Sequence, residues 1–145
     1  MAENHPLIEA RQQEVIADFA VFDDWMDKYE YIIDMGKDLP GIPESEKTDE
    51  NLVRGCQSKV WLHAGTEEGK LNFQADSDAL ITKGIISLLI RVMNGEEPKE
   101  VAESEFAFID AIGLKEHLSP NRANGLTSMI KKMKAYALGL SLKNA

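Results

Sequence analysis

Residues 59–76 read KVWLHAGTEEGKLNFQAD, and this stretch predicts the class of fold better than any other part of the chain. Lys59–Ala64 is rich in β-branched and aromatic residues, a composition that favours a strand. Gly65–Gly69 has the composition of a hairpin connection. Lys70–Asp76 then alternates apolar and polar residues, as a half-buried antiparallel strand does. The sequence therefore predicts a small antiparallel sheet near the middle of the chain.

A helix is predicted directly after this hairpin. Ser77 or Asp78 is the expected N-cap, and the helix runs through Met93. It is apolar around most of its circumference, which is typical of a central, buried helix. Asn94-Gly95 is the expected end, because glycine is frequent just past a helix C-terminus.

The rest of the C-terminal half is predicted to be mainly helical. Pro98–Glu103 suits a short helix, whereas Phe106–Leu114 fits either a third strand or a short helix. Ser119 followed by Pro120 predicts the start of a last helix, because serine caps helices and proline suits the first helical position. The core-facing stripe of that helix comprises Leu126, Met129, Ile130, Met133, Ala137 and Leu140.

Two helices are predicted before the sheet. The second is capped by Asp23 or Asp24 and stops at Leu39–Gly41, and a further short helical turn is expected near Thr48. Helices, then a small antiparallel sheet, then helices predict an α+β fold in which helices cover one face of the sheet, built as a single domain over residues 1–145. The apolar positions of these two helices are Ile8, Val15, Ile16 and Phe19, and Trp25, Tyr29, Ile32, Ile33 and Gly36.

Composition limits the partners of this chain. It carries 16 Lys and Arg residues against 25 Asp and Glu, a net charge of −9, and such a surface repels nucleic acid and anionic lipid. A hydrophobic fraction of 43% over 145 residues is enough for a core without a disulfide or metal. The N-terminus lacks the pattern of a secretion signal, and the apolar run 85–93 is shorter than the ~20 residues that span a bilayer. We therefore expect a cytoplasmic protein with protein partners and no membrane association.

Cys56 is the only cysteine in the sequence. One thiol forms no internal disulfide, supplies no cysteine-rich metal site and holds no iron–sulfur cluster unaided. Three roles remain for it: a buried structural residue, a nucleophile, or a carrier that accepts a group and passes it on. Free cysteine is among the most buried residue types, so the structural role is the general default.

The neighbours of Cys56 favour a reactive role over a structural one. A long polar stretch rich in turn residues, 40–51, precedes it, and the predicted strand follows, so the thiol stands at the end of a loop. Gly55 permits a tight bend directly before it. Arg54 and Lys59 flank it with positive charge, which would favour the thiolate unless both side chains are simply solvated.

Two histidines are candidate general bases for a thiol nucleophile. His63 lies about 23 Å from Cys56 if the chain between them is extended, and His117 is remote in sequence. A Cys-His hydrolase needs the imidazole within hydrogen-bond reach, so a surface or capping role suits each histidine better. The cysteine and the three histidines of the chain show none of the short spacings of zinc ligands, so no metal site is predicted.

Two other segments have both a structural and a functional interpretation. Arg122 stands in the first turn of the last helix, where the helix dipole disfavours a cation, so it either pairs with an acid or approaches another chain or loop. Asn124 and Gly125, both poor helix formers, follow it closely. The run Asp76–Asp78 either caps the central helix or holds the Cys56 loop through backbone amides.

Four blocks stand out in the sequence, in this order: Tyr29–Gly36 with Leu39-Pro40; Asn51 with Gly55-Cys56-Gln57-Ser58 and Val60-Trp61; Asp76–Ala79 with Lys83-Gly84; and His117–Arg122 with Gly125-Leu126. Together they resemble the SufE family of sulfur-acceptor proteins in iron–sulfur cluster assembly, and the resemblance extends over most of the chain. It rests on all four blocks and not on the cysteine block alone.

The resemblance implies a SufE/IscU-like α+β fold and a specific chemistry. A pyridoxal-phosphate cysteine desulfurase of the SufS/CsdA type would pass persulfide sulfur to Cys56, which would deliver it to a SufBCD-type scaffold complex. IscU-type scaffolds bring several cysteines, whereas this chain has one, so the resemblance implies a carrier. It implies no cofactor on this chain, and partner-binding or loop-supporting roles for Gly55, Gln57, Ser58, Asp78 and Arg122. In this family the cysteine tucks into a cavity, for which Trp61 or the central helix could form a wall.

Three functional hypotheses follow from the sequence. The leading one is a sulfur carrier that also activates its desulfurase. The second is a Cys56-dependent hydrolase that uses His63 or His117. The third is an adaptor that binds a partner through its acidic surface and uses Cys56 only for packing.

Overall fold

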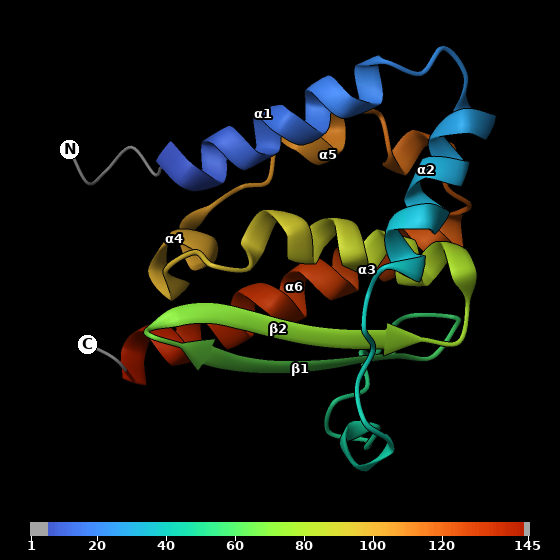
Figure 1. Cartoon of the computed structure of the whole chain (residues 1–145). Helices are drawn as coiled ribbons and strands as arrows, with labels where there is room; N and C mark the ends of the chain where they lie inside the picture. The colour runs from blue at the N-terminus through green and yellow to red at the C-terminus, as the bar shows by residue number, and fades with distance from the viewer. Residues whose placement is uncertain (1–5, 144–145) are drawn as a thin grey trace.

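The computed structural model describes residues 6–143 as an α+β fold with one antiparallel hairpin (Figure 1). The hairpin joins β1 (Val60–Glu67) to β2 (Lys70–Ser77), so the predicted sheet is confirmed. The strands run further than predicted and leave a turn of only Glu68 and Gly69, whose φ angles are 54° and 81°. Two consecutive positive φ angles give the turn the twist that a two-residue hairpin connection requires.

One face of the hairpin is buried against helices. Its core residues alternate along the strands, as the period-two pattern predicts. Figure 1 shows α3 (Leu80–Met93) between the hairpin and α1 (Pro6–Ala20), with α6 (Pro120–Lys143) running obliquely behind them, so helices cover one face of the sheet as expected. The buried residues of the hairpin are Val60, Leu62, Leu71, Phe73 and Ala75.

The central helix α3 is buried along most of its length, as predicted. Its N-cap is Ala79, without a side-chain cap, so the expectation of Ser77 or Asp78 as the cap was wrong. Both residues instead bond to Lys59, because β2 extends to Ser77 and keeps them beside β1. α2 (Trp25–Lys37), capped by Asp24 as predicted, crosses α3 at close range.

The remaining elements are short. α4 (Pro98–Glu103) has the predicted bounds, and α5 (Phe108–Ala111) shows that the ambiguous stretch forms a short helix rather than a strand. A 3₁₀ turn, η3 (Lys115–His117), precedes α6. The helical turn expected near Thr48 is present, because the Asn51 amide donates to the Thr48 carbonyl at 3.1 Å and the Leu52 amide donates to the Asp49 carbonyl at 3.3 Å. The 3₁₀ turn η2 (Glu44–Glu46) precedes it.

The segment 42–52 crosses the outer face of the hairpin, below it in Figure 1. Lys47 lies over the Trp61 ring at 5.1 Å, and Glu46 pairs with His63 at 3.3 Å. This segment therefore packs against β1 just before the chain enters the Cys56 loop.

Among residues 6–143, no helix combines the length and the apolar composition that a bilayer crossing demands.

Candidate functional site: the Cys56 loop and its cavity

Cys56 stands at the tip of a loop whose base is tied to β1. Leu52 forms a bridge with Trp61, the Val53 amide donates to the Val60 carbonyl at 2.8 Å, and the Leu62 amide donates to the Asn51 carbonyl at 2.7 Å. These bonds extend the sheet by one short stretch before the cysteine. Residues 54–59, which are not paired with β1, form the end of the loop, and we call them the loop tip.

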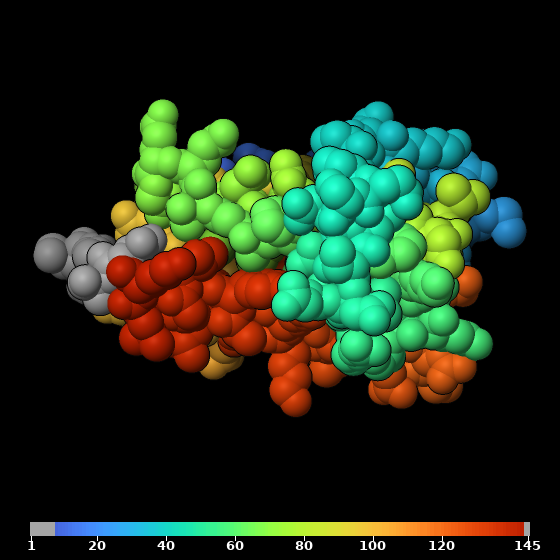
Figure 2. Space-filling model, turned by 90° about the horizontal axis from the view of Figure 1, so that it is seen from below, coloured from blue at the N-terminus to red at the C-terminus, as the bar shows by residue number. Residues whose placement is uncertain are grey.

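The thiol of Cys56 is half-buried and faces a cavity of about 40 Å³. Its Sγ lies 3.7 Å from the Gly125 carbonyl oxygen of α6, to which the S–H donates. Figure 2 shows the loop region lying beside α6. The cavity is lined by Cys56, Gln57 and Ser58 from the loop tip, by Thr82 and Ile85 from α3, and by Asn121, Arg122, Gly125 and Met129 from α6.

Burial raises the pKa of the Cys56 thiol above its ordinary value. The expectation that Arg54 and Lys59 would favour the thiolate was therefore wrong for this state of the loop, because desolvation of the sulfur dominates. The S–H of Cys56 also donates to the Gly125 carbonyl, a hydrogen bond that only the protonated thiol forms. The sheltered thiol is thus a protected, weakly nucleophilic form.

The raised pKa predicts the pH dependence of Cys56 alkylation. Reaction with iodoacetamide should have its midpoint at a higher pH in the folded protein than in urea, where the thiol titrates near its ordinary value of about 8.5. Because the unfolded chain releases its proton first, the thiol's contribution to stability is complete below about pH 8.5 and is lost as the pH rises from there through the folded pKa. An equal or lower midpoint in the folded protein would show that burial does not control this thiol.

The absence of a side chain at Gly125 makes room for the sulfur. A Cβ at this position would lie 3.3 Å from Cys56 Sγ, tighter than ordinary van der Waals contact. Gly55 has a φ of 91°, and a Cβ there would lie 2.5 Å from Ser128 Oγ on α6. Two glycines thus let the loop tip and α6 approach closely enough to shelter the thiol.

Alanine at Gly125 should therefore displace the thiol without harming the helix. We expect Gly125→Ala to speed Cys56 alkylation about threefold or more, because the sulfur must shift by a few tenths of an ångström from its shelter. Alanine is also a better helix former by up to about 1 kcal/mol, so thermal stability should be kept or raised. Unchanged alkylation in a folded variant would count against the role assigned to Gly125. Gly139→Ala is the control, since no described atom lies within 4 Å of its added Cβ.

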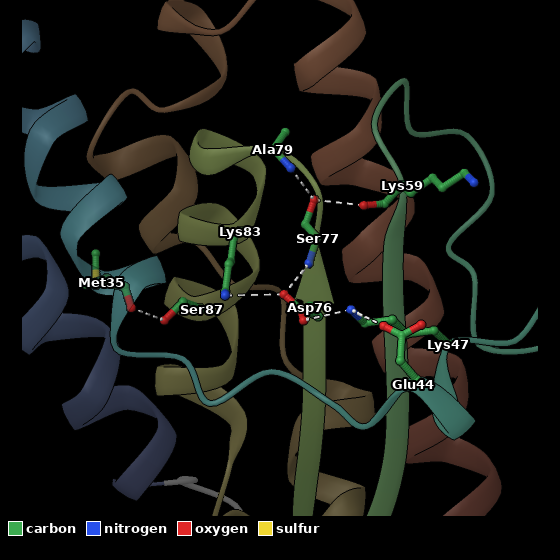
Figure 3. Close-up of polar contacts among 9 residues, drawn as sticks. All are labelled: Met35, Glu44, Lys47, Lys59, Asp76, Ser77, Ala79, Lys83 and Ser87. Carbon is green, nitrogen blue, oxygen red and sulfur yellow. Dashed lines mark hydrogen bonds and ion pairs between the residues drawn. The ribbon is translucent and has the colours of Figure 1, made fainter.

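The far end of the loop tip is held by β2. The Lys59 amide donates to Asp78 Oδ1 at 3.1 Å. Ser77 Oγ donates to the Lys59 carbonyl at 2.8 Å (Figure 3). Asp78 therefore supports the loop through a backbone amide, which is one of the two roles its sequence context allowed. Its carboxylate lies on the exposed surface beside the loop.

Asp76 fixes the surroundings of this end of the loop. Its carboxylate lies 3.3 Å from Lys83 Nζ and 3.4 Å from Lys47 Nζ, and it accepts from the Ser77 amide at 2.8 Å (Figure 3). Although burial acts to raise it, these three partners hold the pKa of Asp76 below its usual range. Asp76 thus ties together α3, β2 and the segment that crosses the hairpin.

The other predicted site residues gather at the cavity. Gln57 and Ser58 line it from the loop tip, and Asn121 Nδ2 lies 3.5 Å from Gln57 Oε1. Arg122 lines it from the first turn of α6, where its backbone amide donates to Ser119 Oγ at 3.3 Å. Within residues 6–143 the Arg122 guanidinium has no acidic partner, so the interpretation of Arg122 as a simple ion-pair residue is not supported.

Neither described histidine reaches Cys56. His63 Nδ1 pairs with Glu46 Oε1 at 3.3 Å on the outer face of the hairpin. His117 stacks on Trp25 with ring centroids 4.1 Å apart, and its Nδ1 lies 3.0 Å from the Gly113 carbonyl oxygen. Since neither lines the cavity, the Cys56-dependent hydrolase lacks its general base and that alternative is wrong in this geometry.

The cavity walls were only partly predicted. The central helix forms a wall through Thr82 and Ile85, as expected, but Trp61 is not among the lining residues. Met129 was expected only as a core residue, and the contact of Gly125 with the sulfur was missed. A glycine in the middle of a helix was the available signal, since it often marks a close approach. Within residues 6–143, no three His, Cys, Asp or Glu side chains cluster as metal ligands would.

Residues 13–137 match the family described as SufE, an Fe-S metabolism associated domain. The chain belongs to the SufE family. This membership confirms the resemblance that rested on the four sequence blocks, and it places the cysteine loop in the matched region. The family is associated with iron–sulfur metabolism.

Several SufE-like proteins are similar to this chain over most of its length. An uncharacterized SufE-like protein of Rhizobium meliloti is 44% identical, over 87% of this chain and 94% of that protein. The chloroplastic/mitochondrial SufE-like protein 1 of Arabidopsis thaliana is 38% identical over 90% of this chain, which corresponds to 36% of the longer plant protein. A solution structure of a hypothetical protein from Thermus thermophilus shares the fold, with a TM-score of 0.76 at 22% identity over 92% of this chain and 96% of that one.

Proposed function

We propose that this SufE-family protein is a sulfur carrier that accepts persulfide sulfur on Cys56 from a cysteine desulfurase. The single observation that carries the proposal is the placement of the only cysteine at the tip of a tied loop, over a cavity that shelters its sulfur. A structural cysteine needs no such loop, and a hydrolase needs a base that neither His63 nor His117 supplies.

The proposed reaction is a thiol exchange without net oxidation. The Cys56 thiolate attacks the outer sulfur of the desulfurase persulfide, a new sulfur–sulfur bond forms at Cys56, and the desulfurase thiolate leaves. The proton of Cys56 is given up before the attack. This step needs one accessible nucleophilic sulfur and no triad, which agrees with the surroundings of Cys56. Pyridoxal phosphate is expected on the desulfurase alone.

The proposal requires the loop tip to move. The sheltered thiol has a raised pKa and hydrogen bonds to Gly125, so it must leave the cavity to meet a donor sulfur in another protein. The bonds at Val53 and Lys59 mark the two ends of the segment that would swing. On return, the cavity of about 40 Å³ offers space for the added sulfur, which would then be kept from other thiols and oxidants.

Arg122 is proposed to act when the loop is out. Its guanidinium lines the cavity and has no acidic partner within residues 6–143, so it is available to a thiolate, a persulfide anion or an acidic group of the desulfurase. Gln57 and Ser58 are proposed to contact the partner from the loop tip, with Gly55 supplying the bend. Docking is proposed to activate the desulfurase, and delivery to a SufBCD-type scaffold in the cytoplasm would complete the transfer.

Mass spectrometry tests the proposal. After incubation with a SufS- or CsdA-type desulfurase and cysteine, the chain should gain the mass of one or more sulfur atoms at Cys56, and a reductant should remove it. A chain that binds and stimulates the desulfurase but never gains sulfur would instead be an adaptor. Hydrogen exchange of residues 50–58 should increase in the complex, and unchanged protection there would contradict the proposed movement.

A further inference from the structure

One face of α6 supports the segment that carries Cys56. Positions 125, 128, 132 and 136 are three or four residues apart and therefore lie on the same side of the helix. The first three positions each contact the segment 50–56. We call all four positions the α6 stripe. The contacts are Gly125 with Cys56, Ser128 with Gly55, and Lys132 with Glu50 and Leu52, while Tyr136 lies under Lys132.

Lys132 makes the polar contacts of this stripe with the base of the loop. Its Nζ donates to the Glu50 carbonyl at 3.1 Å and to the Leu52 carbonyl at 2.9 Å. The ammonium also lies 5.6 Å from the centre of the Tyr136 ring, a cation–π distance. Glu50 and Leu52 are separated from Lys132 by 82 and 80 positions in sequence, so these bonds are tertiary contacts that join the loop to α6.

The two ends of the loop tip are held by different elements. The far end, Lys59, is held by Ser77 at the end of β2 and by Asp78, the residue that follows the strand. The near end pairs with β1, and its turn over residues 48–52 is held to α6 by Lys132. Gly125 and Lys132 belong to the same helix, α6. A near end fixed to Lys132 therefore keeps the Cys56 sulfur close to the Gly125 carbonyl oxygen.

We propose that Lys132 is a positioning residue that fixes the near end of the Cys56 loop to α6 and confines its movement to residues 54–59. The thiol then returns to the same place beside Gly125 after each excursion. This role deepens the proposed function, on which its biological meaning rests, because a sheltered persulfide survives between the two transfers. Without Lys132 the near end is held by β1 alone, and the thiol leaves its cavity more often.

Alkylation of Cys56 in the isolated protein tests this role. Lys132→Met keeps the stem and removes the donors, and it should speed reaction with iodoacetamide about fivefold, the population change expected when one net hydrogen bond is lost. Lys132→Arg restores donors to both carbonyls and should stay near the wild-type rate. Lys131→Met is the matched control, because Lys131 is exposed on the same helix and makes no polar contact with described residues. Lys132→Leu, which also has no hydrogen-bond donor, serves as a second neutral variant if Lys132→Met folds poorly.

Hydrogen exchange separates positioning from general loss of stability. In Lys132→Met, amides of residues 51–58 should exchange faster while those of α3 keep their wild-type protection. The proposal is overturned if both neutral variants alkylate at the wild-type rate, or if Lys131→Met is accelerated as much as Lys132→Met. It is also overturned if protection falls equally in α3, which would mean that the whole fold is loosened.

These measurements use no desulfurase and are independent of sulfur transfer. If Cys56 never accepts sulfur but the Lys132 variants alkylate as predicted, the proposed function fails and the positioning role stands. If sulfur transfer occurs but alkylation is unchanged in Lys132→Met, only the positioning role fails. In the persulfidated protein, Lys132→Met should also lose its outer sulfur to added thiol about fivefold faster than wild type.

Discussion

Replacing Cys56 with serine is expected to abolish sulfur acceptance completely. A serine hydroxyl is almost fully protonated at neutral pH and forms no bond with the outer sulfur of a persulfide, so no second group in this chain can take the sulfur. After incubation with desulfurase and cysteine, Cys56→Ser should show no added sulfur by mass spectrometry. Sulfur delivery to a scaffold should fall to the level supported by the desulfurase alone.

The same variant should keep its fold and its affinity for the desulfurase. Serine is nearly the size of cysteine, and the sulfur is only half-buried, so the free energy of unfolding should change by less than about 1 kcal/mol. Thermal unfolding and calorimetric titration with the desulfurase measure the two properties. Sulfur still found on the serine variant would show that Cys56 is not the acceptor, and normal delivery to the scaffold would show that its chemistry is dispensable.

The second large effect is expected at the crossing of α2 and α3. A Cβ on Gly84 would overlap the Ile32 carbonyl group, and one on Gly36 would lie 2.7 Å from the Gly84 nitrogen. These neighbours are backbone atoms, so the two helices would have to separate. We expect Gly84→Ala to lower the free energy of unfolding by about 1–3 kcal/mol, as overpacking does, even though alanine favours a helix. Urea unfolding measures this change.

Gly139→Ala is the matched control for the crossing. It introduces the same side chain into a helix, at an exposed position with no described atom within 4 Å. It should raise the free energy of unfolding by up to about 1 kcal/mol, because alanine loses less conformational freedom than glycine. Equal changes in the two variants would mean that helix propensity, and not the close crossing, determines the effect at Gly84.

Local patterns in the sequence predict most of this fold. The alternation of Lys70–Asp76, the Ser119-Pro120 helix start and the all-round apolar helix ending at Met93 depend on neighbours in sequence, and each was placed within a few residues. The cap of α3 was misplaced because β2 continues through Ser77 and keeps Ser77 and Asp78 bonded to Lys59. These bonds depend on how segments remote in sequence pack together, and the residue type at a helix N-terminus does not predict that.

The sequence predicts the reactive residue of the candidate site, but it does not predict the residues of α6 that hold this residue and its loop. A lone Cys56 after a glycine and a polar loop pointed to the reactive sulfur, because the signal is local. The contact between Gly125 and the sulfur, and that between Lys132 and the loop, join residues 69 and 80 or more positions apart. The pKa of Cys56 was misjudged for the same reason: flanking cations are visible in sequence, whereas burial under α6 is not.

The most direct test of the account follows one sulfur atom between two proteins. A desulfurase is loaded with radioactive sulfur as its persulfide, freed from cysteine, mixed with this chain, and quenched with an alkylating agent. We predict that the label leaves the desulfurase, appears on Cys56 and is released by reductant. Label that stays on the desulfurase while the two proteins form a complex would contradict the claim that this chain carries sulfur.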